Sequence, residues 1–222
     1  MPVLFIMAVI LMAVIGIFSY LANKKRKEAL RVLASRLGMV FTEEKNYNLA
    51  AQYGFLNKLA QGDNRYLFNT FSGTYRDQQI LISDYHYETH STDSKGRSQT
   101  HHRYLSMFTL QLPLTFPELI IVREGLLSKI AQAFGYEDID FESAEFSRMF
   151  CVRSPDKKFA YDVCNAKMID YLIDHKDLSI EIDRNVLAMI FDMQLIIEQV
   201  ETNLNRLLEI RCRMPNYLLE RI

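Results

Sequence analysis

The chain has 222 residues, of which 49% are hydrophobic and 24% are charged, so it is long and apolar enough to bury a core. A formal net charge of -1 argues against nucleic acid as a partner. The 8 Gly and 5 Pro exclude collagen-like and low-complexity structure, and three Cys cannot form a disulfide framework.

The first segment predicts a membrane span. Residues 3–22 form a run of 20 uncharged and mostly aliphatic residues. A helix of this length spans about 30 Å, which is the thickness of the hydrocarbon core of a bilayer. A cleaved signal peptide is the alternative, but it requires a charged start and a shorter apolar run. Only Met1 and Pro2 precede this run, so we expect an uncleaved anchor.

Basic residues directly after the span predict its orientation. Four of them are consecutive: Lys24, Lys25, Arg26 and Lys27. The positive-inside rule places this end in the cytoplasm, so we expect a single-pass membrane protein with a cytoplasmic domain. Unpaired thiols agree with that reducing compartment. The same four residues are candidates for contact with anionic lipid at the membrane surface. The simpler alternative is that they only fix the orientation of the span in the membrane.

Charge and hydrophobic patterning divide the chain into three parts. Residues 1–22 are the transmembrane anchor, 23–64 are a basic juxtamembrane helix with a connector, and 65–222 are an α+β domain. Residues 23–37 carry six basic groups and one acid, a net charge of +5, so the rest of the chain must carry -6. This acidic remainder further opposes binding of nucleic acid.

The elements of the connector and the domain follow from hydrophobic periodicity. A helix is expected over 24–37, with Leu30, Leu33 and Leu37 on one face and Gly38 at its end, then a short strand at 39–42 and a short helix at 49–53. The strands predicted in the domain are 66–71, 79–90, 101–112, 118–123, 149–153, 178–182 and 186–191. The helices predicted there are 126–134, 159–163, 166–173 and 195–213.

Turn signals arrange these strands into an antiparallel sheet. Residues 91–100 are polar and predict an exposed hairpin loop, and Pro113 is expected to end the third strand because it lacks a ladder donor. Residues 183–185 predict a second hairpin turn. Four strands, three more strands and a C-terminal amphipathic helix resemble the pleckstrin-homology-like fold. An alternative use of the helix at 195–213 is self-association, but docking on its own sheet is simpler.

Histidines cluster around the predicted hairpin and suggest a metal site. With 91–100 as the loop, His90 lies opposite His101, and His86 lies further along the same strand pair. Imidazoles this close across two strands can bind zinc. A solvated hairpin tip is the simpler alternative, because a metal site needs three or four convergent ligands.

Familiar catalytic motifs are absent from the sequence, including the nucleophile elbow, the phosphate-binding loop and the zinc-protease motif. We therefore assign no catalytic residue and expect no cofactor. Asp138, Asp140 and Glu142 alternate, which suits a cation site or, more simply, the wet face of an edge strand.

Two stretches resemble a family of bacterial proteins that carry one or two N-terminal membrane spans and have no assigned activity. One is the stretch at 138–163, and the other combines 71–75 with 82–85. The likeness extends over about 65–215. It implies a membrane-anchored domain at the bacterial inner membrane and carries over no catalytic residue.

The sequence thus favours a cytoplasmic binding or scaffolding module at the membrane surface, with the bilayer and a membrane or cytoplasmic protein as partners. The anchor would raise the effective concentration of the domain for such a partner. The candidate contact loops are 73–78, with Arg76, and 91–100, with Lys95 and Arg97. The alternative is a membrane-tethered, metal-dependent enzyme that uses His86, His90 and His101.

Overall fold

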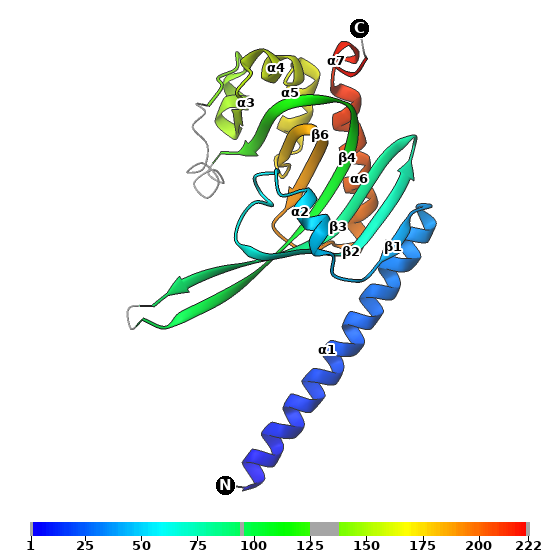
Figure 1. Ribbon diagram of the computed structural model, residues 1–222, viewed down its shortest axis with the longest axis vertical. Coiled ribbons are helices and arrows are strands. Elements are labelled where there is room, and N and C mark those ends of the chain that lie inside the picture. Colours follow the sequence, from blue (N-terminus) through cyan, green and yellow to red (C-terminus); the bar gives the residue numbers. More distant parts are fainter. Residues whose placement is uncertain (1, 94–95, 125–137, 221–222) are drawn as a thin grey trace.

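An antiparallel sheet with helices on it forms the body of the protein, and one long N-terminal helix projects from that body (Figure 1). The computed structural model describes residues 2–93, 96–124 and 138–220. The α+β class is therefore confirmed. The helix predicted at 126–134 and the candidate residue Lys95 lie outside the described residues.

Helix α1 (Pro2–Arg36) joins the predicted span and the predicted juxtamembrane helix without a break. Its apolar part is long enough to cross a membrane and is not buried against the rest of the chain. Its last turns are different, because Leu30, Leu33 and Ala34 are buried in the core of the domain. Gly38 follows with φ +69°, a left-handed conformation that glycine adopts at no steric cost and that ends the helix.

The described residues form a sheet of six strands: β1 (Val40–Thr42), β2 (Asp63–Tyr75), β3 (Gln78–Thr92), β4 (Ser98–Arg123), β5 (Phe150–Arg153) and β6 (Ile180–Phe191). Their order is β1-β2-β3-β4-β5, and β6 also pairs with β4. All of these pairings are antiparallel. The β3–β4 hairpin extends well beyond the sheet as a two-stranded arm (Figure 1).

The prediction that Pro113 ends a strand is wrong, because β4 continues through it to Arg123. The pairing of β3 with β4 stops at Leu110, so Pro113 has no β3 partner whose hydrogen bond it could remove. On the β6 side, the register shifts between Gln111 and Phe116. Pro113 therefore lies in an irregular stretch that bends the strand without ending it.

The predicted second hairpin is also wrong, because residues 180–191 form the single strand β6. Both halves of β6 pair with β4: Ile182 lies opposite Leu119, and Val186 lies opposite Gln111. Arg184, with φ +53°, lies at the register shift between them. The turn-rich triplet therefore makes a bulge rather than a reversal.

The helices of the domain are α2 (Tyr47–Gln52), α3 (Ala144–Met149), α4 (Lys157–Val163), α5 (Ala166–Asp174), α6 (Ile197–Arg213) and α7 (Asn216–Leu219). The main core lies between one face of the sheet, the end of α1 and the later helices. A smaller core lies on the opposite face, where Leu56 and Leu59 of the connector pack on Tyr85 and Met107. The stretch around Asp140, predicted as an edge strand, is not in a strand.

Candidate functional site

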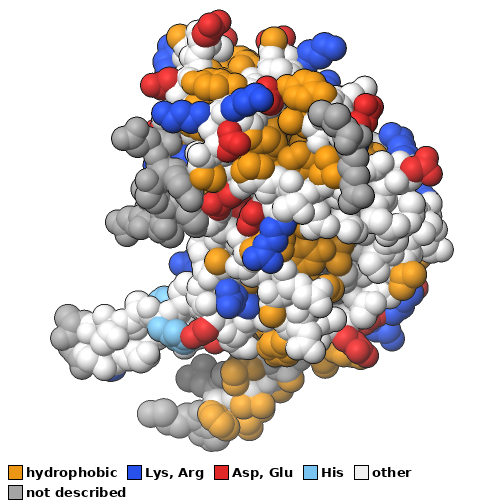
Figure 2. Space-filling view, turned by 45° about the horizontal axis from the view of Figure 1, so that its top comes forward, with side chains coloured by type: hydrophobic (Ala, Val, Ile, Leu, Met, Phe, Trp, Pro, Cys, Tyr) orange, Lys and Arg blue, Asp and Glu red, His pale blue; other side chains and the backbone are white. Residues whose placement is uncertain are grey.

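A cluster of histidine and carboxylate side chains lies at the base of the β3–β4 arm. Histidines, pale blue in Figure 2, gather there beside an acidic side chain. The strand register places Glu88 opposite His102 and His86 opposite Tyr104. Because side chains alternate along a strand, His86, Glu88 and His102 project from the same face of the arm.

The predicted pairing of His90 with His101 is wrong, because the hairpin pairs one residue away from the expected register. His90 lies opposite Thr100, and His101 lies opposite Thr89. His101 therefore projects from the other face of the arm, where its Nε2 lies 2.8 Å from Ser91 Oγ. A slip of one residue exchanges the two faces of a strand, which brings His102 into the cluster in place of His101.

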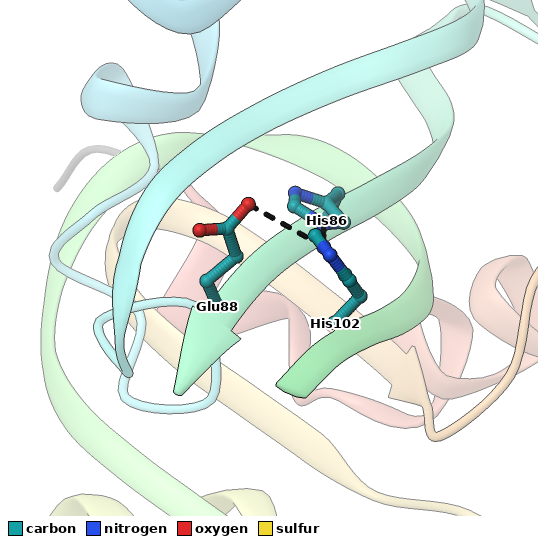
Figure 3. Close-up of side chains that lie close together, drawn as sticks. All are labelled: His86, Glu88 and His102. Atoms are coloured by element: carbon teal, nitrogen blue, oxygen red, sulfur yellow. Dashed lines mark hydrogen bonds and ion pairs between the residues drawn. The ribbon is translucent and has the colours of Figure 1, made fainter. Parts of the chain in front are cut away.

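The three ligand-type side chains point toward one another (Figure 3). His86 Nε2 lies 3.0 Å from His102 Nδ1, which lies 3.4 Å from Glu88 Oε1. His86 is only 1% exposed, and its ring stacks on that of Tyr66 at a centroid distance of 4.4 Å. Burial lowers the pKa of His86, so its imidazole is neutral at physiological pH.

Glu88 is a member of the cluster that sequence reasoning missed. Its position two residues after His86 on the same strand is the signal that could have identified it. His90 belongs to a neighbouring, more exposed group, in which its Nε2 lies 3.1 Å from Asp63 Oδ2 and Glu88 is also close. The structure therefore separates His86 from His90 and connects both to Glu88.

A second polar centre joins α1 to the sheet. Arg26 Nη2 donates to Asp84 Oδ2 at 2.9 Å and to the carbonyl oxygen of Leu195 at 3.0 Å. Asp84, whose side chain is fully buried, also accepts from Asn69 Nδ2 and from the backbone amide of Leu195. Burial raises the pKa of Asp84 above its ordinary value, although these hydrogen bonds and the Arg26 charge act in the opposite direction.

The four basic residues after the span have different surroundings. Lys24 and Lys25 are exposed, whereas Arg26 turns inward to Asp84. The Nζ of Lys27 lies 3.4 Å from a carboxylate oxygen of Glu43. Arg26 therefore connects α1 to the domain and is not part of an open basic surface.

The structure does not bring the predicted contact loops together. Arg76 lies in the β2–β3 turn with φ +47°, and Arg97 lies in the β3–β4 loop, so the two occupy opposite ends of β3 (Figure 1). Arg97 is also engaged locally, because its Nε donates to Asp93 Oδ2 at 2.8 Å. The two loops therefore cannot form one continuous patch.

One hollow of about 370 Å³ lies beside the connector, over the strands β2, β3, β4 and β6. Its walls include Tyr53, Phe55, Ile80, Leu110 and Val186. None of the described residues that line it is Asp, Glu, His, Lys, Arg or Cys. The polar side chains that line it carry only hydroxyl and amide groups, among them Ser72, Thr109 and Gln111.

A buried carboxylate holds the connector on the sheet. Glu181 of β6 accepts hydrogen bonds from the backbone amides of Asn57, at 2.7 Å, and Lys58, at 3.0 Å. Burial raises the pKa of Glu181 to about 7, and the nearby charge of Glu118 acts in the same direction. This contact is structural, because both of its donors are backbone groups of the connector.

No protein-family model matches the sequence, and no curated protein matches it. Among solved structures, the crystal structure of the mycobacterial trehalose monomycolate transport factor A has a similar fold, with a TM-score of 0.56. The two chains are 10% identical, and the match covers 85% of this chain and 96% of the other. At this level of identity, the likeness concerns the fold alone.

Proposed function

We propose that this protein is a single-pass, membrane-anchored binding or scaffolding module whose domain sits at the cytoplasmic surface of the bacterial inner membrane. The observation that carries the proposal is the continuity of α1. The helix passes from an exposed apolar segment directly into the core of the domain, with no flexible linker between them.

The connection between α1 and the domain is rigid, because the end of the helix packs inside the domain. Leu30 and Ala34 are fully buried, so the end of the helix is part of the domain. Arg26, one turn earlier, is bonded to Asp84. A domain fixed in this way keeps one height and one orientation above the bilayer, which raises its effective concentration for a partner at that height.

The nature of the fold neighbour supports a role other than catalysis. That neighbour is a transport factor, and the fold of this chain resembles its fold over most of both chains. By this analogy, we suggest that the present domain assembles or positions a membrane transport complex, an inference from fold alone. A pleckstrin-homology-like topology stays a prediction, because it rested on a count of seven strands within residues 65–222, where the described residues form the five strands β2 to β6.

The test compares the full-length protein with a variant that carries a short Gly/Ser linker after Asn23. The linker keeps the anchor and the domain intact but removes their fixed orientation. We expect wild type, solubilised from native membranes in mild detergent, to recover a stoichiometric protein partner. The linker variant should recover much less of it, at equal abundance in the membrane fraction.

The matched control places the same linker at the C-terminal end of the chain, where it should leave recovery unchanged. Equal recovery of the partner by all three proteins would show that a fixed orientation of the domain is not needed for partner binding. Absence of any partner would count against the scaffolding role itself. The charge reversals Lys95→Glu with Arg97→Glu, and separately Arg76→Glu, then test which contact loop takes part.

A further inference from the structure

We infer that His86, Glu88 and His102 form a binding site for a divalent transition-metal ion of the zinc type, at the base of the β3–β4 arm. This inference does not depend on the proposed function. It concerns metal binding and assigns no reaction to the site.

The separations of the ligand atoms suit a single small ion. In a tetrahedral zinc site with bonds of about 2.0–2.1 Å, two ligand atoms are about 3.3 Å apart. Here the two measured separations are 3.0 Å, between His86 Nε2 and His102 Nδ1, and 3.4 Å, between His102 Nδ1 and Glu88 Oε1. All three ligand atoms lie within 4.8 Å of one another, so only small side-chain adjustments are needed.

The surroundings of His86 orient its free lone pair toward the cluster. Its Nδ1 lies 3.2 Å from the backbone carbonyl oxygen of Asn64. A carbonyl oxygen only accepts, so Nδ1 carries the proton and Nε2 presents a lone pair to His102. Metal-binding histidines typically donate their second ring N–H to a carbonyl or a carboxylate in this way. The rings of Tyr66 and Tyr104 hold the imidazole in place.

Asn64 orients a second ligand as well. Its side-chain Nδ2 donates to Glu88 Oε1 at 2.6 Å, while its carbonyl oxygen holds His86. Asn64 has φ +45°, a left-handed conformation that lets one residue serve both ligands. Two of the three ligands are thus oriented by the same neighbour, as in a prepared metal site.

Ligand type and exposure indicate which ions would bind. Two imidazole nitrogens and one carboxylate favour zinc and similar transition metals over Mg²⁺ and Ca²⁺, which prefer oxygen ligands. The side chain of His102 is 57% exposed, so an ion can enter from solvent and a water molecule can complete its coordination. The nearby set of Asp63, Glu88 and His90 lacks a buried ligand, so we assign the site to the His86 set.

An ion at this position would join β3 to β4 through side chains. The hairpin beyond it extends away from the body of the protein (Figure 1). Metal binding would therefore restrict the bending of the arm that ends in the predicted contact loop with Arg97. We therefore expect metal binding to reduce the motion of the arm and to leave the motion of the core unchanged.

The experiment uses full-length protein in mild detergent, without a polyhistidine tag and after treatment with a chelator. Zn²⁺ is titrated in competition with a chromophoric chelator, and Co²⁺ is added separately, because its visible absorption reports coordination geometry. We expect one Zn²⁺ per chain in the wild type. The variants His102→Ala and Glu88→Gln should weaken binding by about tenfold or more.

The matched control is His101→Ala, which removes the adjacent histidine on the opposite face of the arm and should leave affinity unchanged. His102 and His101 both lie on the arm outside the core, so neither substitution should unfold the protein, and circular dichroism checks this. Equal loss in both variants would overturn the assignment, as would loss in His90→Ala with none in His102→Ala. Failure of wild type to bind Zn²⁺ at micromolar concentrations would exclude the site altogether.

Discussion

Arg26, one turn before the buried Leu30 of α1, donates a hydrogen bond of 2.9 Å to Asp84, a fully buried carboxylate in the middle of β3. Asp84 also accepts from the backbone amide of Leu195, at 2.7 Å, just before α6. One carboxylate therefore connects the candidate membrane helix, the central sheet and the C-terminal helix. Burial of the two partners differs, since the Arg26 side chain retains some contact with solvent.

Replacement of Arg26 by Ala should destabilise the domain markedly. Removing one partner of a buried ion pair leaves the other charge without compensation, and we expect a loss of about 3 kcal/mol in the free energy of unfolding. The measurement is chemical unfolding of the full-length protein in detergent, followed by circular dichroism. Lys25→Ala, an exposed neighbour, is the control and should change stability little.

The loss of folding stability in Arg26→Ala should also depend on pH. Burial already raises the pKa of Asp84, and removal of the nearby positive charge raises it further. An acid whose folded-state pKa is raised destabilises the fold above that pKa and ceases to do so once it is protonated. The difference between Arg26→Ala and wild type should therefore shrink as the pH falls through the raised pKa of Asp84. A constant difference would mean that Asp84 is not the group left uncompensated.

Packing of α1 into the core predicts a contrast between two residues of the same helix. Leu30 is fully buried, so Leu30→Ala should cost about 2–5 kcal/mol through lost burial and a cavity. Val32 is 61% exposed, so Val32→Ala should stay within about 0.5 kcal/mol of wild type. Thermal unfolding of both variants measures the contrast. Equal effects would contradict the docking of α1 on the domain.

Glu181 predicts a pH-dependent contribution to stability. Burial raises its pKa to about 7 from 4.5, so between these values the folded state retains a proton that the unfolded state has lost. Stability from this group falls as pH rises through that window, by roughly 3 kcal/mol in total. Glu181→Gln should remove this part of the slope in unfolding measurements between pH 4.5 and 7. Glu124→Gln, at an exposed position, should keep the slope of wild type.

The native cysteines provide a test of orientation. Cys212 is exposed, whereas Cys151 and Cys164 are buried, and burial raises the pKa of each of these two thiols to about 12. A membrane-impermeant maleimide should therefore label Cys212 alone, because the thiolate is the reactive form. For a cytoplasmic domain, labelling should occur in inverted vesicles and not in spheroplasts. Cys212→Ser should abolish it, and labelling of intact spheroplasts would reverse the proposed orientation.

Local patterns predicted the candidate anchor and most helices well. The apolar run at 3–22 and the leucine stripe of Leu30, Leu33 and Leu37 each specify a helix through residues that are close in sequence. The predicted helices at 159–163 and 166–173 correspond to α4 and α5 within two residues at each end. These features succeed because helical hydrogen bonds and helical faces are local in the chain.

Strand boundaries depended on partners that the sequence does not identify. Pro113 was expected to end the strand β4, but the pairing of β4 with β3 already stops at Leu110, so the proline removes no hydrogen bond from that pair. The triplet at 183–185 looked like a turn, but β4 offers pairing on both sides of it. Whether a proline or a turn-former ends a strand is decided by the neighbouring strand and its register.

The candidate metal cluster could also be predicted only in part from the sequence, and the tertiary structure decided the rest. The sequence alone identified a histidine-rich hairpin, because residue type and proximity along the chain are visible in it. The tertiary structure decided which histidines meet, since the pairing of Glu88 with His102 sets the faces of every other residue in the arm. The alternation of side chains has a period of two, so one residue of register exchanged His101 for His102 on the face that carries His86 and Glu88.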